Sequence, residues 1–245
     1  MVNKMINNIK ELIKIDKKEV LRYLQYKNQN INEDLSNLIN ESIEETKKII
    51  NPKFVLRRYT IKKINKENGK KQVILENGNL ILESDDIYNL FEKCDECILM
   101  ATTLGLDIER EIRKLTYTNL TKGVIMDACA TTAIEEVCDV VQENIAKNLS
   151  SEDRYITYRY SPGYGDLSID KNIDINNILN SQKEIGLTVT NSGIMIPRKS
   201  VVALIGVSDK KAISTKKSCD YCNNRHNCDY KKEGHSCGDK KILKR

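Results

Sequence analysis

Residues 54–82, FVLRRYTIKKINKENGKKQVILENGNLIL, decide the fold class. Val55, Arg57, Tyr59 and Ile61 occupy every second position, which is the period of a strand. Two Asn-Gly pairs, at 68–69 and 77–78, then separate further apolar runs, and Asn-Gly is a favoured pair for tight hairpin turns. The stretch therefore predicts a three-stranded meander.

Helical periodicity dominates on both sides of this meander. Apolar residues recur at helical spacing through residues 3–50 and stop at Asn51-Pro52, which predicts a helical cap or partner-binding segment. Downstream, Ser84 followed by two aspartates predicts a helix N-cap. The further expected elements are helices after Ser84, from 107, at 121–149 and at 174–183, and strands at 98–102, 155–160, 187–190 and 201–207. Because strands and helices do not alternate strictly, the predicted class is α+β.

The chain is expected to divide into three parts. These are a helical N-terminal segment (1–52), an α+β domain with an antiparallel or mixed sheet flanked by helices (53–207), and a basic, Cys-rich tail (208–245). The tail holds the charge: residues 209–245 carry eleven Lys and Arg against five Asp and Glu, while the whole chain has a net charge of +5.

The expected compartment is the cytoplasm, without a membrane partner. No run of 18 or more apolar residues occurs, and residues 1–25 mix Lys with Asp and Glu instead of forming a secretory leader. Eight cysteines in that compartment argue against a disulfide framework and for metal or redox roles where their spacing is close. Four of them are expected to be packing residues: Cys94, Cys97, Cys129 and Cys138.

The segment Arg159-Tyr-Ser-Pro-Gly-Tyr164 suits the binding of a small zwitterion. A guanidinium can hold a carboxylate through two hydrogen bonds, a bare backbone at Gly163 admits a ligand closely, and a Tyr ring can face a cation. The same residues also make an ordinary type II turn, with Pro162 at its second position and Gly163 at its third.

Three motifs in this order resemble the activation domain of cobalamin-dependent methionine synthase. They are Arg159-x-x-x-Gly163-Tyr164, the strand Ile185-Gly-Leu-Thr-Val-Thr190, and the Met195-x-Pro197 turn that leads into Lys199-Ser-Val201. The resemblance covers about residues 85–207 and includes, more loosely, 99–105 and the helix around 127–135. It implies an α+β fold as in that domain, with Thr131 standing where a family carboxylate is expected.

The resemblance also implies a ligand, S-adenosyl-L-methionine (AdoMet). Arg159 would bind the AdoMet carboxylate, while Gly163 and Tyr164 would contact the ligand around its adenosyl and sulfonium portions. Ser161 and Pro162, which form the turn between them, complete the predicted cofactor-binding segment.

Asp127 is a further candidate for ligand binding. On a helical wheel it lies among Ile134, Cys138 and Ile145, inside the apolar sector, where a carboxylate needs a partner. It would face the positive ligand or support Arg159, or else be a hydrogen-bonded core Asp. Glu135 lies at the edge of the same stripe and is expected to be a boundary residue.

The tail presents a candidate metal site in the pattern Cys219-x2-Cys222-x5-Cys228-x8-Cys237. A chelating pair with two further thiolates can complete a shell of four ligands, either for zinc or for an iron-sulfur cluster. His226 and His235 lie within the same segment, so a zinc site of three thiolates and one imidazole stays open.

The function implied by the resemblance is reductive reactivation of a cobalamin enzyme. The protein would act in trans as a component of a methyltransferase system, presenting AdoMet to cobalamin on a methionine synthase or its cobalamin domain. A redox donor such as flavodoxin or ferredoxin would supply the electron. The alternatives are a corrinoid-linked iron-sulfur redox protein and a zinc-containing nucleic-acid-binding protein. Nucleic acid ranks lower because the basic tail holds few aromatic side chains for stacking.

Overall fold

The structure is a computed structural model that describes residues 9–26, 29–65, 69, 71–76 and 80–210. Its helices are α1 (Ile9–Leu12), α2 (Lys17–Tyr23), α3 (Glu33–Ile49), α4 (Asp85–Leu90), α5 (Leu106–Thr118), α6 (Leu120–Ser150), α7 (Lys171–Leu179) and α8 (Ser181–Ile185). Its strands are β1 (Lys53–Asn65), β2 (Lys71–Leu75), β3 (Leu80–Glu83), β4 (Glu96–Thr103), β5 (Tyr155–Ile156), β6 (Thr188–Val189), β7 (Met195–Ile196) and β8 (Ser200–Ser208). The predicted α+β class is confirmed.

Six strands form one antiparallel sheet in the order β3-β2-β1-β4-β8-β5, and β6 pairs with β7 in a separate hairpin. The predicted meander is present as β1, β2 and β3. Strand β1 is long enough to pair with two neighbouring strands: residues 61–65 pair with β2, and residues 53–60 pair with β4. The sheet therefore continues from the meander into the centre of the molecule.

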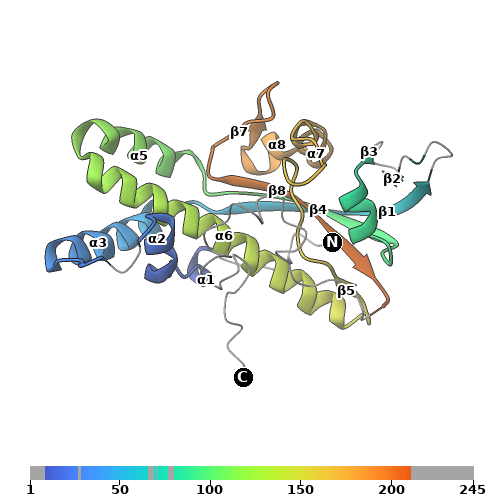
Figure 1. The fold of residues 1–245 in the computed structure, drawn as a ribbon, viewed down its shortest axis with the longest axis horizontal. Helices are drawn as coiled ribbons and strands as arrows, with labels where there is room; N and C mark the ends of the chain where they lie inside the picture. Colours follow the sequence, from blue (N-terminus) through green and yellow to red (C-terminus); the bar gives the residue numbers. More distant parts are fainter. Residues whose placement is uncertain (1–8, 27–28, 66–68, 70, 77–79, 211–245) are drawn as a thin grey trace.

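Helices cover both faces of the sheet, and the central strands are apolar on both sides. In β4, Ile98 and Met100 join the core under α1–α3, α5 and α6, while Cys97 and Leu99 join the core under α4, α7 and α8. This alternation follows from the two-residue period of a strand. Figure 1 shows α6 running along one side of the sheet with α1–α3, and α7 and α8 lying on the other.

The N-terminal helices α1–α3 pack into the same hydrophobic core as α6. Ile13, Val20, Ile39 and Ile43 are buried in the same cluster as the inner face of α6. None of the helices in the described ranges is long and apolar enough to cross a membrane. The expected boundary at residue 52 and the partner-binding role of residues 3–50 stay predictions.

Local signals in the sequence account for several helix ends. Ser84 accepts a hydrogen bond from the Ile87 amide, as predicted for the N-cap of α4. The single helix expected over 174–183 is instead two helices, because Asn180 adopts the left-handed conformation (φ 53°) between α7 and α8. Asn tolerates that conformation better than most residues, so the break falls there.

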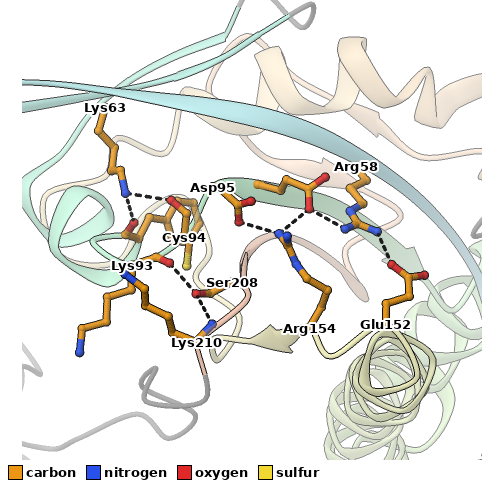
Figure 2. Close-up of polar contacts among 11 residues, drawn as sticks. Arg58, Lys63, Lys93, Cys94, Asp95, Glu152, Arg154, Ser208 and Lys210 are labelled. Carbon is orange, nitrogen blue, oxygen red and sulfur yellow. Dashed lines mark hydrogen bonds and ion pairs between the residues drawn. The ribbon is translucent and has the colours of Figure 1, made fainter.

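A polar network fixes the end of the sheet at which β8 ends (Figure 2). Glu96 Oε2 accepts from Arg58 Nη2 at 2.5 Å and from Arg154 Nη2 at 2.6 Å, which joins β1, β4 and the segment after α6. Lys63 Nζ donates to three carbonyl oxygens of the turn at residues 91–94, and Ser208 Oγ donates to the carbonyl oxygen of Lys93 in the same turn. The turn is therefore held by both β1 and β8.

Four thiols are buried, as predicted for packing residues. Burial raises the pKa of Cys94 to about 11 and those of Cys129 and Cys138 to about 12, and it also raises the pKa of Cys97. Because the thiolate is the reactive form, we expect all four to resist iodoacetamide at pH 8 in the native protein and to react in urea. Peptide mass mapping measures this, and native-state labelling at any of the four would contradict the packing.

Candidate functional site

A polar stripe runs along the outer face of α6. Asp127, Thr131, Glu135 and Asp139 follow one another at intervals of four residues, which places them on one side of the helix. The opposite side of α6 is buried against the sheet and α1–α3. Asp127 is exposed and the other three residues of the stripe are partly exposed, so a ligand can reach it.

Arg159 lies against the C-terminal half of this stripe. Its Nη2 donates to Glu135 Oε2 at 2.7 Å, and its Nη1 donates to Asp139 Oδ1 at 2.6 Å and to Gln142 Oε1 at 3.2 Å. The Arg159 side chain is only 17% exposed, whereas that of Glu135 is 42% exposed. The guanidinium predicted to hold a ligand carboxylate is therefore already paired with carboxylates of the protein.

The Arg159 guanidinium remains charged in this setting. Burial works to lower its pKa, but the neighbouring Cys138, Asp139 and Glu135 outweigh that effect, and the pKa of Arg159 is raised. A carboxylate entering from solvent would meet a permanent cation whose present partners are partly exposed. Of these partners, Glu135 is the more exposed, at 42% against 25% for Asp139, so it is the one that an entering carboxylate could displace at the lower cost.

Lys199, in the turn between β7 and β8, supplies a second cation at the other half of the stripe. Its Nζ lies 2.8 Å from Asp127 Oδ1 and donates to Thr131 Oγ1 at 2.8 Å. Thr131, found where the family resemblance implies a carboxylate, thus serves as a hydroxyl partner of a lysine. The stripe has one cation at each half.

The predicted environment of Asp127 was wrong. Its side chain is 52% exposed and paired with Lys199, instead of lying in the apolar sector of α6. Ile134, Cys138 and Ile145, which share its sector of the wheel, are buried, but they lie about two or more turns further along α6. At the level of Asp127 the helix borders an open hollow instead of a packed core. The role of Asp127 in ligand binding stays a prediction, now as an exposed carboxylate.

The turn after Arg159 has the predicted geometry. The Tyr164 amide donates to the Ser161 carbonyl at 3.3 Å, and Gly163 has φ 90°, as the third position of a type II turn requires. Pro162 is buried and Tyr164 is 61% exposed. The Gly163 amide donates to the Leu167 carbonyl at 2.8 Å, which closes the loop on itself.

An open hollow of about 550 Å³ lies beside the stripe, between α2, α5 and α6. Asp127 and Thr131 line it, together with apolar side chains such as Leu24, Ile112 and Val124. Its lining includes neither Arg159 nor residues 161–164. The predicted site residues are therefore distributed along α6: Asp127 lies at the hollow, and Arg159 lies two to three turns further along.

Sequence reasoning missed three charged residues of this arrangement. Glu135 was expected to be a boundary residue, Asp139 was not considered, and Lys199 was named only as part of the motif that leads into a strand. The spacing of four from Asp127 through Thr131 and Glu135 to Asp139 was the available signal. For Lys199 no comparable signal exists, because its contacts to α6 span 68 residues or more of sequence.

The predicted metal ligands Cys219, Cys222, Cys228 and Cys237 lie outside the described residues, so the choice between zinc and an iron-sulfur cluster stays a prediction. Across residues 9–210, omitting the gaps named above, no group of three or more His, Cys, Asp or Glu could hold a metal ion.

Comparison with known proteins places this chain in a family. Residues 2–226 match the family model described as the vitamin B12 dependent methionine synthase activation domain. The chain belongs to this family. The match begins upstream of residue 85, where the resemblance in the sequence was expected to start, so α1–α3 and the meander also belong to the activation-domain region, and it extends past residue 207.

A solved structure supports the same fold for the activation domain. The chain is similar to the MetH reactivation domain bound to AdoHcy, with a TM-score of 0.54 and 15% sequence identity over 88% of this chain and 77% of that one. No curated protein matches the chain in sequence.

Proposed function

We propose that this protein binds AdoMet along the polar stripe of α6, with Arg159 holding the carboxylate of the ligand, and presents its methyl group to a corrinoid on a partner. The observation that carries the proposal is the pairing of Arg159 with Glu135 and Asp139 in a chain of the activation-domain family. The neighbour bound to AdoHcy shares the fold, which is consistent with this choice of ligand.

The charges of the stripe match those of AdoMet. The ligand carries one carboxylate, one ammonium and one sulfonium, so its net charge is positive. The three carboxylates Asp127, Glu135 and Asp139 outnumber the two cations paired with them, Lys199 and Arg159. A ligand carboxylate would take over the guanidinium, and the freed Glu135 or Asp139 would face the cationic groups of the ligand.

The protein would contribute to the reaction by binding and orienting AdoMet. The methyl group of AdoMet is already electrophilic, and the reduced cobalt of a partner's corrinoid is the nucleophile, so no general base is needed. Holding the carboxylate of AdoMet at Arg159 would fix one end of the ligand, and Gly163 and Tyr164 of the turn would contact its adenosyl and sulfonium portions. Proximity of this kind can account for a large share of a rate enhancement.

Calorimetric titration of the full chain with AdoMet and with AdoHcy tests the ligand. AdoHcy lacks the sulfonium charge, so we expect AdoMet to bind more tightly. We also expect Glu135→Gln to weaken the binding of AdoMet more than the binding of AdoHcy. A carboxylate near the sulfonium stabilises only AdoMet, because AdoHcy has no sulfonium. The absence of binding heat for either ligand at high protein concentration, at two temperatures, would refute the proposal.

We extend the proposal to action in trans on a cobalamin-dependent methionine synthase or its cobalamin domain. The assay supplies an inactive, oxidised methionine synthase without its own activation region, AdoMet and a reductant such as reduced flavodoxin or ferredoxin. Recovery of methionine synthesis should require both AdoMet and this protein. Equal recovery without the protein would refute action in trans, and the titration would still decide ligand binding.

A further inference from the structure

Asp86, on the opposite side of the sheet from α6, lies in the space that a side chain at residue 165 would fill. Gly165 follows the Ser161–Tyr164 turn and has φ 53°. A Cβ atom added there would be 1.9 Å from Asp86 Oδ2 and 2.2 Å from Tyr160 Oη. The loop can approach α4 this closely only because residue 165 is glycine.

One carboxylate oxygen of Asp86 joins both ends of the loop to α4. Asp86 Oδ2 accepts a hydrogen bond from Tyr160 Oη at 2.9 Å and one from the Asp166 amide at 3.4 Å. Tyr160 precedes the Ser161–Tyr164 turn and Asp166 follows it. Burial, with further contributions from Asp86, raises the pKa of Tyr160, so the phenol stays a donor at physiological pH.

The loop holds the start of α4 in return. The Asp166 carboxylate accepts from the Asp85 amide at 2.6 Å, from the Asp86 amide at 3.4 Å and from the Ser84 hydroxyl. Ser84 in turn caps α4 at the Ile87 amide. Each of the two segments therefore satisfies polar groups of the other, and release of one leaves donors of the other unpaired.

Tyr160 connects this contact to Arg159. The backbone of Tyr160 pairs with Leu204 of β8 in both directions, at 2.9 and 2.8 Å, so residues 159 and 160 lie in an extended segment. Consecutive side chains of an extended chain point to opposite faces. Accordingly, Tyr160 reaches Asp86 on one face of the sheet and Arg159 reaches α6 on the other.

We propose that Asp86 is a positioning residue for the ligand-binding segment 159–165, acting through the Tyr160 hydroxyl and the Asp166 amide. The identity of the ligand, AdoMet, rests on the proposed function. The positioning of the segment by Asp86 does not depend on it. Asp86 touches no ligand in this scheme. It holds the Ser161–Tyr164 turn and the direction of Arg159 in one arrangement, which lowers the cost of ordering the loop when AdoMet binds.

The first test compares AdoMet affinities by calorimetry for Asp86→Ala, Tyr160→Phe and the double variant, each shown to be folded by circular dichroism. We expect each single change to weaken binding about tenfold, and the double variant to lose no more than Asp86→Ala alone, because the two groups act through one hydrogen bond. Asp86→Asn, which keeps an oxygen acceptor, should recover affinity to within about threefold of wild type.

Asp85→Ala is the matched control. Asp85 is the neighbouring carboxylate at the start of α4, is exposed, and gives only its backbone amide to the contact. Its removal should leave affinity within about twofold of wild type. Wild-type affinity in both Asp86→Ala and Tyr160→Phe, or losses that add in the double variant, would overturn the proposal.

Amide hydrogen exchange on the free protein separates this proposal from the proposed function. The Gly163 amide, bonded to the Leu167 carbonyl at 2.8 Å, and the Leu167 amide, bonded to the Tyr164 carbonyl at 3.1 Å, report on the loop. We expect both to exchange at least tenfold faster in Asp86→Ala and Tyr160→Phe, but not in Asp85→Ala, with β4 unchanged. If the wild-type protein fails to bind AdoMet, the proposed function is refuted, and the exchange rates alone then decide whether Asp86 positions the loop. Unchanged exchange rates in Asp86→Ala and Tyr160→Phe would overturn the positioning role.

Discussion

Arg159→Ala is expected to weaken AdoMet binding by roughly 30- to 150-fold. The side chain would supply two charge-assisted hydrogen bonds to the ligand carboxylate, and such bonds contribute about 2–3 kcal/mol to binding when one partner is removed. The Arg159 side chain is mostly buried, so water cannot replace it at full strength. Calorimetric titration of the variant with AdoMet measures the loss directly.

The same substitution is expected to destabilise the free protein. Without the guanidinium, Glu135 and Asp139 stand one turn apart on α6 as an unneutralised pair of like charges. We expect the free energy of unfolding to fall by about 2 kcal/mol, which corresponds to a fall in Tm of about 4–8 °C. This loss is smaller than for a fully buried pair because both carboxylates are partly exposed. Arg159→Lys should restore most of the stability but only part of the affinity, since an ammonium lacks the planar fork of donors.

Arg110→Ala is the control for a lost arginine. Arg110 is 73% exposed and pairs with Asp107 at 3.2 Å on α5, and surface pairs of this kind contribute little to stability. We expect unchanged AdoMet affinity and Tm within about 1–2 °C of wild type. If Arg159→Ala bound AdoMet as tightly as Arg110→Ala does, Arg159 would have no role in holding the ligand.

The elements of the fold follow from local signals in the sequence. The two-residue period from Val55 to Ile61 and the two Asn-Gly pairs predicted the β1-β2-β3 meander, and Ser84 predicted the start of α4. The long helix expected at 121–149 extends over Leu120–Ser150. These signals succeed because strand period, turn conformation and helix capping depend on residues that are close in sequence.

The site was only partly predictable because its contacts are distant in sequence. Arg159 and the turn at Ser161–Tyr164 carry their own pattern, and the turn formed as expected. The partners of Arg159 lie 17 to 24 residues away on α6, and a helical wheel does not say which outward residue another segment will reach. Asp127 illustrates the same limit, since its position on the wheel suggested burial whereas α5 and α2 leave a hollow there.

Gly206→Ala is expected to cause the largest loss of stability, about 3 kcal/mol. Gly206 lies near the C-terminal end of β8, opposite Cys97 of β4. A Cβ atom at this position would be 2.6 Å from Cys94 Sγ and 2.8 Å from Phe91 Cδ1, and both of those side chains are buried. Thermal or denaturant unfolding measures the loss, which corresponds to a fall in Tm of about 6–12 °C for a chain of this size.

The turn that carries Phe91 and Cys94 is unable to move away from a new methyl group. Lys63 donates to the carbonyl oxygens of residues 91, 92 and 94, and Ser208, two residues beyond Gly206, donates to that of Lys93 (Figure 2). Adding Cys94→Ala to Gly206→Ala removes the nearest atom, so the double variant should be more stable than Gly206→Ala alone even though Cys94→Ala by itself destabilises. Additive losses would mean that the methyl group is accommodated by a shift of β8, and a Gly206→Ala protein with wild-type Tm would contradict the close packing of β8 against this turn.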